Sequence, residues 1–173
     1  MQIKIILISL LVACSYLIGE YIYKAYIKRH KQLNELIRIL EIMRMDLAFG
    51  LYTLDEIFFR LGENKEISLN KFFENMSKEL RSENNDTLEL ILEKNANDME
   101  KETYLQDKEV DELRNLILTL GKGDICSQER MIDLTIENIK KLTTESQEDI
   151  NKKGMVYKKL STIIGLVVGI FLM

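Results

Sequence analysis

The chain has 173 residues, of which 46% are hydrophobic and 30% charged, with no proline, two cysteines and one histidine. Proline is excluded from helix interiors by its fixed φ angle and its missing N–H, so its absence suits a chain that is almost entirely helical. Two cysteines cannot form a disulfide scaffold, and one histidine leaves little for a metal site. A formal net charge of −4 gives no reason to expect a nucleic-acid partner.

Both ends of the chain are apolar. Residues 5–19 and 160–173 contain no charged side chain. A bilayer core about 30 Å thick needs about 20 helical residues, and apolar and tyrosine neighbours extend both segments towards that length. We therefore predict transmembrane helices at 1–23 and 156–173, with a helical domain at 24–155 between them. The alternatives are two buried core helices or, for the first segment, a cleaved signal peptide.

Basic residues flank both apolar segments on the side of the central domain. They are Lys24, Lys28, Arg29 and Lys31 after the first segment, and Lys152, Lys153, Lys158 and Lys159 before the second. An excess of Lys and Arg in short flanking segments marks the cytoplasmic side of a membrane. The two segments agree, so we expect a two-pass membrane protein with a cytosolic central domain and both termini outside.

A second localisation signal competes with this topology. Residues 11–14 (Leu-Val-Ala-Cys) resemble the lipobox of a bacterial lipoprotein, in which Cys14 would be lipidated and the remaining chain exported. However, apolar residues continue as far as Ile18, and the basic cluster that follows opposes export. We therefore favour a membrane helix, in which small residues such as Ala13, Cys14 and Ser15 allow close packing.

Between the apolar ends, hydrophobic residues recur at spacings of three and four, which is typical of amphipathic helices. Polar breaks divide this region into six helices, the first of them continuous with the N-terminal membrane segment. Six helices with short loops predict an all-α fold with a compact bundle. The expected helix starts are Thr53 with Glu56, Ser68, Asp86 with Glu89, and Asp124, and the expected ends are Gly50, Gly62 and Gly121 with Gly123.

The central region contains little that suggests catalysis. Gly121-Lys122-Gly123 lacks the spacing of a phosphate-binding loop, and it is better explained as a helix end. Cys126 lies at a predicted helix start but has no imidazole partner, because His30 belongs to the basic segment beside the membrane. Acidic residues 98–112 alternate with lysines, which is typical of a solvated helix face, although a divalent-cation or partner-binding patch is the alternative. We expect no enzyme activity, no cofactor and no metal site.

Several short motifs, in their order along the chain, resemble the stage III sporulation protein AB family of endospore-forming bacteria. Leu120-Gly121 with Asp124 and Gln128 is similar to the family's LG-x-x-D-x-x-x-Q feature. Residues 53–57 resemble a T-L-x-E-I stretch, although the proline that the family usually has there is absent. The resemblance covers the whole chain, including the basic collar and the lysine-flanked apolar C-terminus.

The resemblance implies a non-catalytic platform protein of a sporulation channel between mother cell and forespore. Its cytosolic domain would be similar to the F-type inner-membrane component of type II secretion systems and type IV pili. It implies a location in the mother-cell membrane around the forespore. The implied partners are a hexameric secretion-type ATPase like the AA protein of the same group (SpoIIIAA-like), other membrane proteins of the channel, membrane lipid and further copies of the chain.

The turn that carries the sharpest part of the resemblance is the candidate partner-binding site, with Gly121, Asp124 and Gln128. A purely structural role is the alternative, in which Gly121 ends one helix and Asp124 caps the next. A membrane-tethered helical adaptor or regulator unrelated to secretion would show the same sequence pattern, and this second function stays open.

Overall fold

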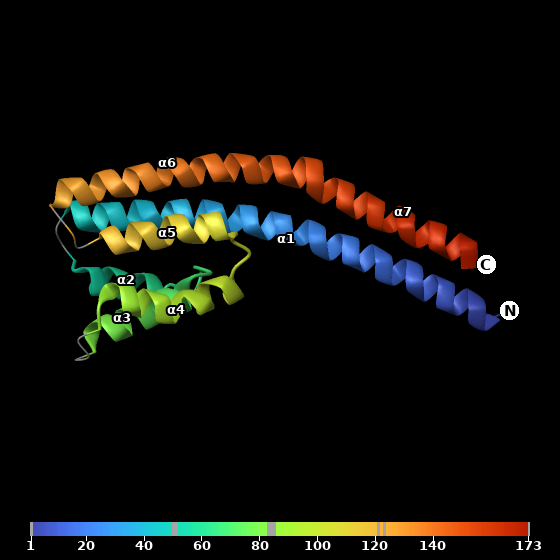
Figure 1. The fold of residues 1–173 in the computed structure, drawn as a ribbon, viewed down its shortest axis with the longest axis horizontal. Helices are drawn as coiled ribbons and strands as arrows, with labels where there is room; N and C mark the ends of the chain where they lie inside the picture. Colours follow the sequence, from blue (N-terminus) through green and yellow to red (C-terminus); the bar gives the residue numbers. More distant parts are fainter. Residues whose placement is uncertain (1, 50–51, 83–85, 121, 123, 173) are drawn as a thin grey trace. The chain divides into compact units, whose positions relative to one another are not determined.

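A computed structural model describes residues 2–49, 52–82, 86–120, 122 and 124–172. Its regular elements are all helical: α1 (Gln2–Ala48), α2 (Leu54–Glu63), α3 (Asn70–Arg81), α4 (Leu88–Glu102), α5 (Asp107–Thr119), α6 (Ile125–Asp149), the π-helix η1 (Ile150–Gly154) and α7 (Met155–Leu172). The all-α prediction is confirmed, and no strand occurs among the described residues (Figure 1). The predicted helix ends at Gly50, Gly121 and Gly123 lie outside the described residues.

The chain forms two compact units. One, here called the helix pair, consists of residues 1–30 and 144–173, and the other, here called the bundle, consists of residues 31–143. The long helices α1 and α6 each contribute residues to both units. The predicted membrane spans at 1–23 and 156–173 fall within the helix pair, and which of its residues lie in lipid stays a prediction.

The bundle contains a single apolar core built from all six of its helical segments. Residues of α1 at positions 33, 36, 40 and 43 are fully buried, as the three- and four-residue spacing predicts. Aromatic packing joins α2 to α3, because the ring of Phe73 lies 5.6 Å from that of Phe58 and 5.2 Å from that of Phe72. Figure 1 shows α2, α3 and α4 grouped together, with α5 alongside α1 and α6.

Local capping signals predicted some helix starts correctly. Thr53 is the N-cap of α2, and its N–H donates to Glu56 Oε2 at 2.8 Å. Asp124 precedes α6 and accepts a bond from the Ser127 N–H at 3.0 Å. Both predicted caps are confirmed, since each depends only on residues within four positions along the chain.

Two other predicted caps are wrong. Ser68 does not cap α3, because its N–H and hydroxyl both donate to Glu35 of α1, at 2.5 and 2.8 Å, and Leu69 occupies the cap position instead. Asp86 does not cap α4, because its carboxylate binds Lys94 Nζ at 2.6 Å and Thr87 is the N-cap. In both cases the side chain predicted to cap the helix instead binds a residue further away along the chain.

Gly62 was expected to end α2, but it lies within the last turn of this helix. A Cβ atom at Gly62 would come within 2.7 Å of the backbone nitrogen of Glu74 in α3. Glycine is therefore needed at this position because the two helix backbones approach closely, and not because the helix ends there.

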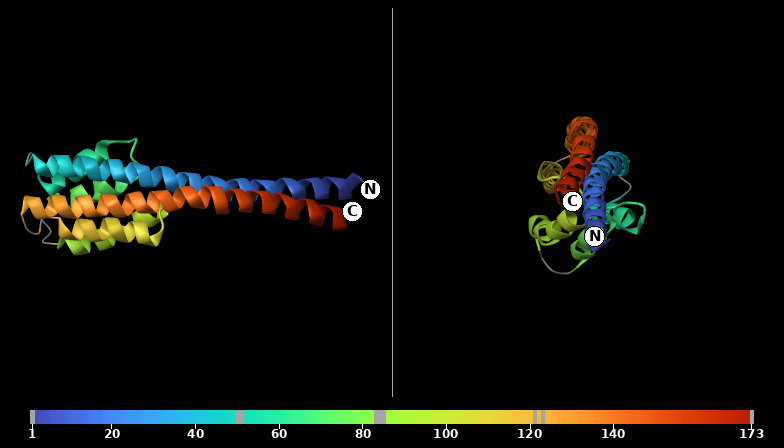
Figure 2. Two further views of the ribbon diagram at one scale, coloured as in Figure 1. Left: turned by 90° about the horizontal axis from the view of Figure 1, so that it is seen from above. Right: turned by 90° about the vertical axis from the view of Figure 1, so that its right-hand side faces the viewer.

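The helix pair is held together by small residues. Ser15 Oγ donates to the backbone oxygen of Ser161 at 2.6 Å, and Ser161 Oγ donates to the backbone oxygen of Ser15 at the same distance. Beside these bonds a Cβ at Gly165 would lie 2.6 Å from Ser15 Cβ. The N- and C-terminal helical segments run side by side in both views of Figure 2. This pattern of small residues and interhelical hydrogen bonds is typical of helices that pack in lipid.

A π-helix joins α6 to α7 within the helix pair. Asp149, at its start, binds the buried Arg29 at 3.3 Å and Lys153 at 2.7 Å. The hydrogen bond from Lys153, followed by that from Arg29, holds the pKa of Asp149 below its usual range. A Cβ at Gly154 would lie 3.2 Å from the ring of Tyr23, so the absence of a side chain lets α1 approach. Ion pairing and close packing thus stabilise this irregular turn.

Candidate partner-binding site

The predicted turn lies at one end of the bundle, where α1 ends and α6 begins. The two helices run antiparallel there (Figure 1), and Arg44 Nη1 of α1 binds Asp133 Oδ1 of α6 at 2.9 Å. Figure 1 shows the end of α1 and the start of α6 at the same end of the bundle. We call residues 45–49, 52 and 124–128 the distal end, since the chain enters and leaves the bundle at its other end, near residues 31 and 143.

Asp124 is part of the folded framework of the distal end. Its side chain accepts the Ser127 N–H at 3.0 Å, and its backbone oxygen accepts the Gln128 N–H at 3.1 Å. The bonds from Ser127 hold the pKa of Asp124 below its usual range, so the carboxylate is charged at neutral pH. The structure thus brings Asp124 and Gln128 together, whereas Gly121 lies outside the described residues.

The distal end also carries exposed apolar side chains, which the motif-based prediction of the site left out. Met45 in the last turn of α1 and Phe49 just beyond this helix are 50% and 73% exposed, and Ile125 is 51% exposed. Their spacing relative to the buried stripe of α1 could have shown that Met45 and Phe49 lie opposite the core. Large apolar residues at the surface of a water-soluble domain, when they gather at one end, mark an interaction site.

The rim of the distal end is held by charged residues. Arg60 Nη1 of α2 lies 3.0 Å from both carboxylate oxygens of Asp46 in α1. The Arg60 guanidinium also lies over the Tyr52 ring, 4.3 Å from its centre. The Arg60 side chain is thus held by the Asp46 carboxylate and by the Tyr52 ring, and these contacts restrict the motion of both Arg60 and Tyr52. The rim is therefore already ordered before any partner binds.

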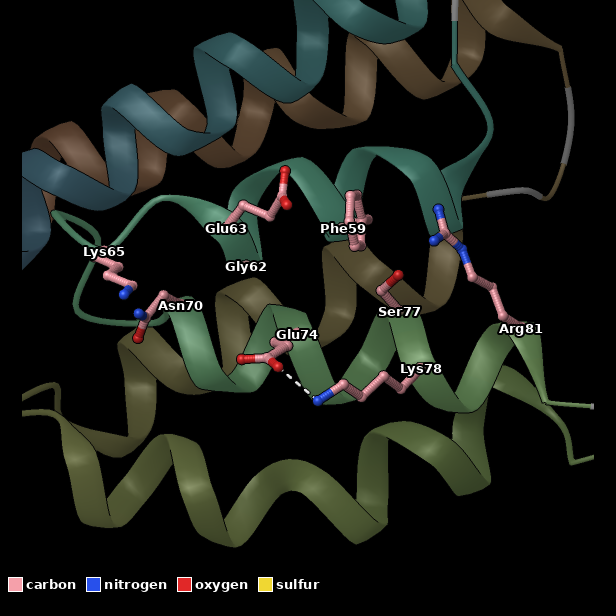
Figure 3. Close-up of a pocket in the computed structure, with 9 residues that line it drawn as sticks. All are labelled: Phe59, Gly62, Glu63, Lys65, Asn70, Glu74, Ser77, Lys78 and Arg81. Carbon is pink, nitrogen blue, oxygen red and sulfur yellow. Dashed lines mark hydrogen bonds and ion pairs between the residues drawn. The ribbon is translucent and has the colours of Figure 1, made fainter.

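A second feature of the bundle surface is a groove of about 380 Å³ between α2 and α3. Figure 3 shows Lys65 and Asn70 at one end of the groove and Arg81 at the other. The remaining lining residues are Phe59, Gly62, Glu63, Glu74, Ser77 and Lys78.

The charges in this groove are largely paired. Lys78 Nζ binds Glu74 at 2.5 Å, and Arg81 Nε binds Asp55 at 2.9 Å while its guanidinium covers the Phe59 ring at 4.7 Å. The Ser77 hydroxyl donates to the Asp55 backbone oxygen at 2.9 Å. The groove therefore presents a mixed, internally satisfied surface rather than a nucleophile with a base.

Within the described residues, no three His, Cys, Asp or Glu side chains are grouped in a way that could hold a metal ion. In the acidic stretch that had suggested a cation patch, Glu109 is fully buried and its carboxylate accepts the Gln106 N–H at 2.6 Å, which closes the start of α5. Cys126 is exposed beside Asp124 and belongs to the bundle, whereas His30 belongs to the helix pair.

The fold and its surfaces define a class: an all-α protein with a bundle between two apolar helical ends. In the part of the chain that the structure describes, two helical stretches are long and apolar enough to cross a membrane by length and composition: Ile6–Ala48, and Ile125–Phe171 across α6, η1 and α7. The sequence profile of the stage III sporulation protein AB family matches residues 4–173, and the chain belongs to that family. The resemblance found in its motifs is thereby confirmed.

A solved structure titled "Stage III sporulation protein AB (SpoIIIAB)" has a similar fold, with a TM-score of 0.63 and 18% sequence identity. The similarity covers 71% of this chain and 96% of the solved one. No curated protein matches the chain. Membership of the family supports a role in sporulation.

Proposed function

We propose that this protein is a non-catalytic platform in a sporulation membrane complex, which joins a cytosolic hexameric secretion-type ATPase to a channel between mother cell and forespore. In this proposal the helix pair crosses the mother-cell membrane around the forespore, and the bundle lies in the cytosol. Family membership supports the sporulation role, and the small-residue packing of the helix pair supports its place in lipid.

The observation that carries the docking part of the proposal is the exposed apolar surface of the distal end. Phe49 and Ile125 are more than half exposed at this end of the bundle, where Arg60 binds Asp46. Interfaces are centred on such large apolar or aromatic anchors, with polar residues around them. Asp124 and Gln128 would supply the polar part of this contact, which deepens the role predicted for the turn.

The test is co-purification of the ATPase with the full chain from sporulating cells. We expect the combined substitution Phe49→Ser and Ile125→Ser to lower the ATPase retained by at least about tenfold, because anchor residues each contribute 2 kcal/mol or more. Leu134→Ser is the matched control, since Leu134 is 49% exposed on α6 but lies outside the distal end. Equal retention by the double variant and the control would remove the distal end from the proposal.

The polar residues need a separate comparison. Asp124→Asn keeps an oxygen that can cap α6, so a purely structural role predicts wild-type ATPase binding and spore yield. A direct contact predicts that Asp124→Asn and Gln128→Ala both lower co-purification without changing the thermal midpoint. If no ATPase is retained even by the wild-type chain while its deletion still blocks sporulation, a membrane-tethered adaptor replaces the platform.

A further inference from the structure

The helix pair contains a pocket of about 520 Å³ that the proposed function does not use. Tyr23 of α1 forms one wall, and the other lining residues all come from α7: Met155, Lys158, Lys159, Thr162 and Ile163. On α7 these residues are spaced by three and four, so they follow one stripe of the helix. The pocket therefore runs along α7 from a basic level into an apolar one.

Lysine charge dominates the polar level of this pocket. Lys158 Nζ binds Glu20 at 2.6 Å and lies 5.1 Å from the centre of the Tyr23 ring, so its position is fixed. Lys159 lines the same pocket, and among the described residues no carboxylate lies within ion-pair distance of it. Glu20 also lies 3.6 Å from Lys24 Nζ, so one carboxylate is shared by two lysines while Lys159 has none among the described residues. The pocket therefore keeps a net positive charge, which suits the negative charge of a phosphate diester.

The apolar level of the pocket continues beyond its lining. Ile163, which is 55% exposed, is followed on the same side of α7 by Leu166, Val167 and Ile170, which are 50%, 58% and 74% exposed. A soluble phosphate would use only the lysines, whereas a lipid would also cover this apolar track. Basic pockets between membrane helices on the cytoplasmic side are suited to anionic lipid headgroups.

We propose that this pocket binds one anionic phospholipid, with its phosphate against Lys158 and Lys159 and an acyl chain along Ile163. Bound there, the lipid contacts both α1 and α7 and so stabilises their pairing at the membrane boundary. The site goes beyond the platform role and requires only that the helix pair lies in a bilayer. Labelling of the native cysteines Cys14 and Cys126, described in the Discussion, tests that requirement independently.

The experiment is native mass spectrometry of the full chain from neutral detergent micelles containing equal amounts of phosphatidylglycerol and phosphatidylcholine. We expect one phosphatidylglycerol to be retained in preference to phosphatidylcholine. Lys159→Gln should lower that preference about fivefold, as expected for one lysine near a lipid phosphate. Lys152→Gln is the matched control, because Lys152 carries the same charge on the turn before α7 but pairs with Glu148 and does not line the pocket.

A second pair of variants tests the acyl-chain contact. Ile163→Ser should lower retention of phosphatidylglycerol, whereas Ile164→Ser should not, because Ile164 is 51% exposed but lies outside the lining. Equal retention of the two lipids by the wild-type chain would overturn the proposal. Equal losses in Lys159→Gln and Lys152→Gln would mean that the preference comes from the overall positive charge and not from this pocket. Equal effects of the two isoleucine variants would mean that only the phosphate is bound, which also overturns the lipid site.

Discussion

The bundle buries large aromatic and aliphatic side chains, whereas the helix pair buries glycines and exposes its large side chains. In the bundle Phe58, Phe72 and Phe73 are at most 1% exposed. In the helix pair the buried positions include Gly19, Gly165 and Gly169, while large residues such as Leu17 and Ile170 are 62% and 74% exposed, respectively.

This difference is the one expected if the bundle lies in water and the helix pair in lipid, as we propose. In water, burying large apolar side chains is the main driving force, so the bundle places them in its core. In lipid, apolar side chains gain nothing by leaving the solvent, so helices associate through close backbone packing and hydrogen bonds between small residues. The reciprocal bonds of Ser15 and Ser161 fit the second case.

The largest expected effect tests this contrast through the two native cysteines, both of which are exposed in the structure. If the helix pair is in lipid and the bundle in the cytosol, a membrane-impermeant maleimide labels neither cysteine in intact cells. After permeabilisation it labels Cys126 in water, but not Cys14 in lipid. Single variants Cys14→Ser and Cys126→Ser assign the label.

Two outcomes of this labelling would contradict the topology. Labelling of Cys126 in intact cells would place the bundle outside. A mature chain beginning at a lipidated Cys14, detected by mass spectrometry, would show a lipoprotein that lacks the first 13 residues.

The next effect concerns the bundle core. Phe73→Ala removes a fully buried ring that contacts two others, and we expect it to lower the free energy of unfolding by about 3–5 kcal/mol. Phe49→Ala makes the same chemical change at a side chain that is 73% exposed, and it should cost less than about 0.5 kcal/mol. Urea titration of the full chain in detergent, followed by circular dichroism, measures both. A similar loss for both variants would mean that Phe49 is covered.

The helix pair, in contrast, should be destabilised by side-chain atoms added at the glycines where its two helices pack. Gly165→Ala would bring a Cβ within 2.6 Å of Ser15 Cβ, and we expect overpacking to weaken the pairing by about 1–3 kcal/mol. A Cβ at Gly169 would meet only side-chain methyl groups, of Ile8 at 3.1 Å and Val12 at 3.4 Å, so Gly169→Ala should cost less. Energy transfer between probes at the two termini, followed as SDS is added to mixed micelles, reports the pairing. Ser15→Gly by itself removes the bond to Ser161, so the double variant Gly165→Ala with Ser15→Gly should lose less than the sum of the two single losses. Additive losses would mean that the contact is not the cause.

The smallest effect is the pH dependence of the Asp124 cap. Folding lowers the pKa of Asp124 below that of an unfolded aspartate, about 3.9. The charged cap therefore stabilises the fold above about pH 4, and this stabilisation is lost as the pH falls through the lowered pKa. Asp124→Asn caps without titrating, so the wild-type urea midpoint should fall relative to that of the variant between pH 5 and about 3. If the difference in urea midpoint between wild type and variant stays constant with pH, the charge of the Asp124 carboxylate does not contribute to stability.

The sequence alone determined the helices and some of their starts. Periodic apolar residues such as Leu36, Leu40 and Met43 predicted the buried face of α1, because helical spacing is a property of a few neighbouring residues. The caps at Thr53 and Asp124 were correct for the same reason, since cap and acceptor lie within four positions. The motifs also indicated the family, which the match over residues 4–173 confirms.

Only the tertiary structure decided the contacts between residues distant in the chain. Ser68 donates hydrogen bonds to Glu35, which lies 33 residues away, and Ser15 bonds with Ser161, which lies 146 residues away. The exposed Phe49 became part of a candidate surface only when α6 placed Ile125 at the same end of the bundle. Local patterns fix the φ and ψ angles of a helix, but the partner of a side chain depends on how whole helices dock, and no short stretch of sequence carries that information.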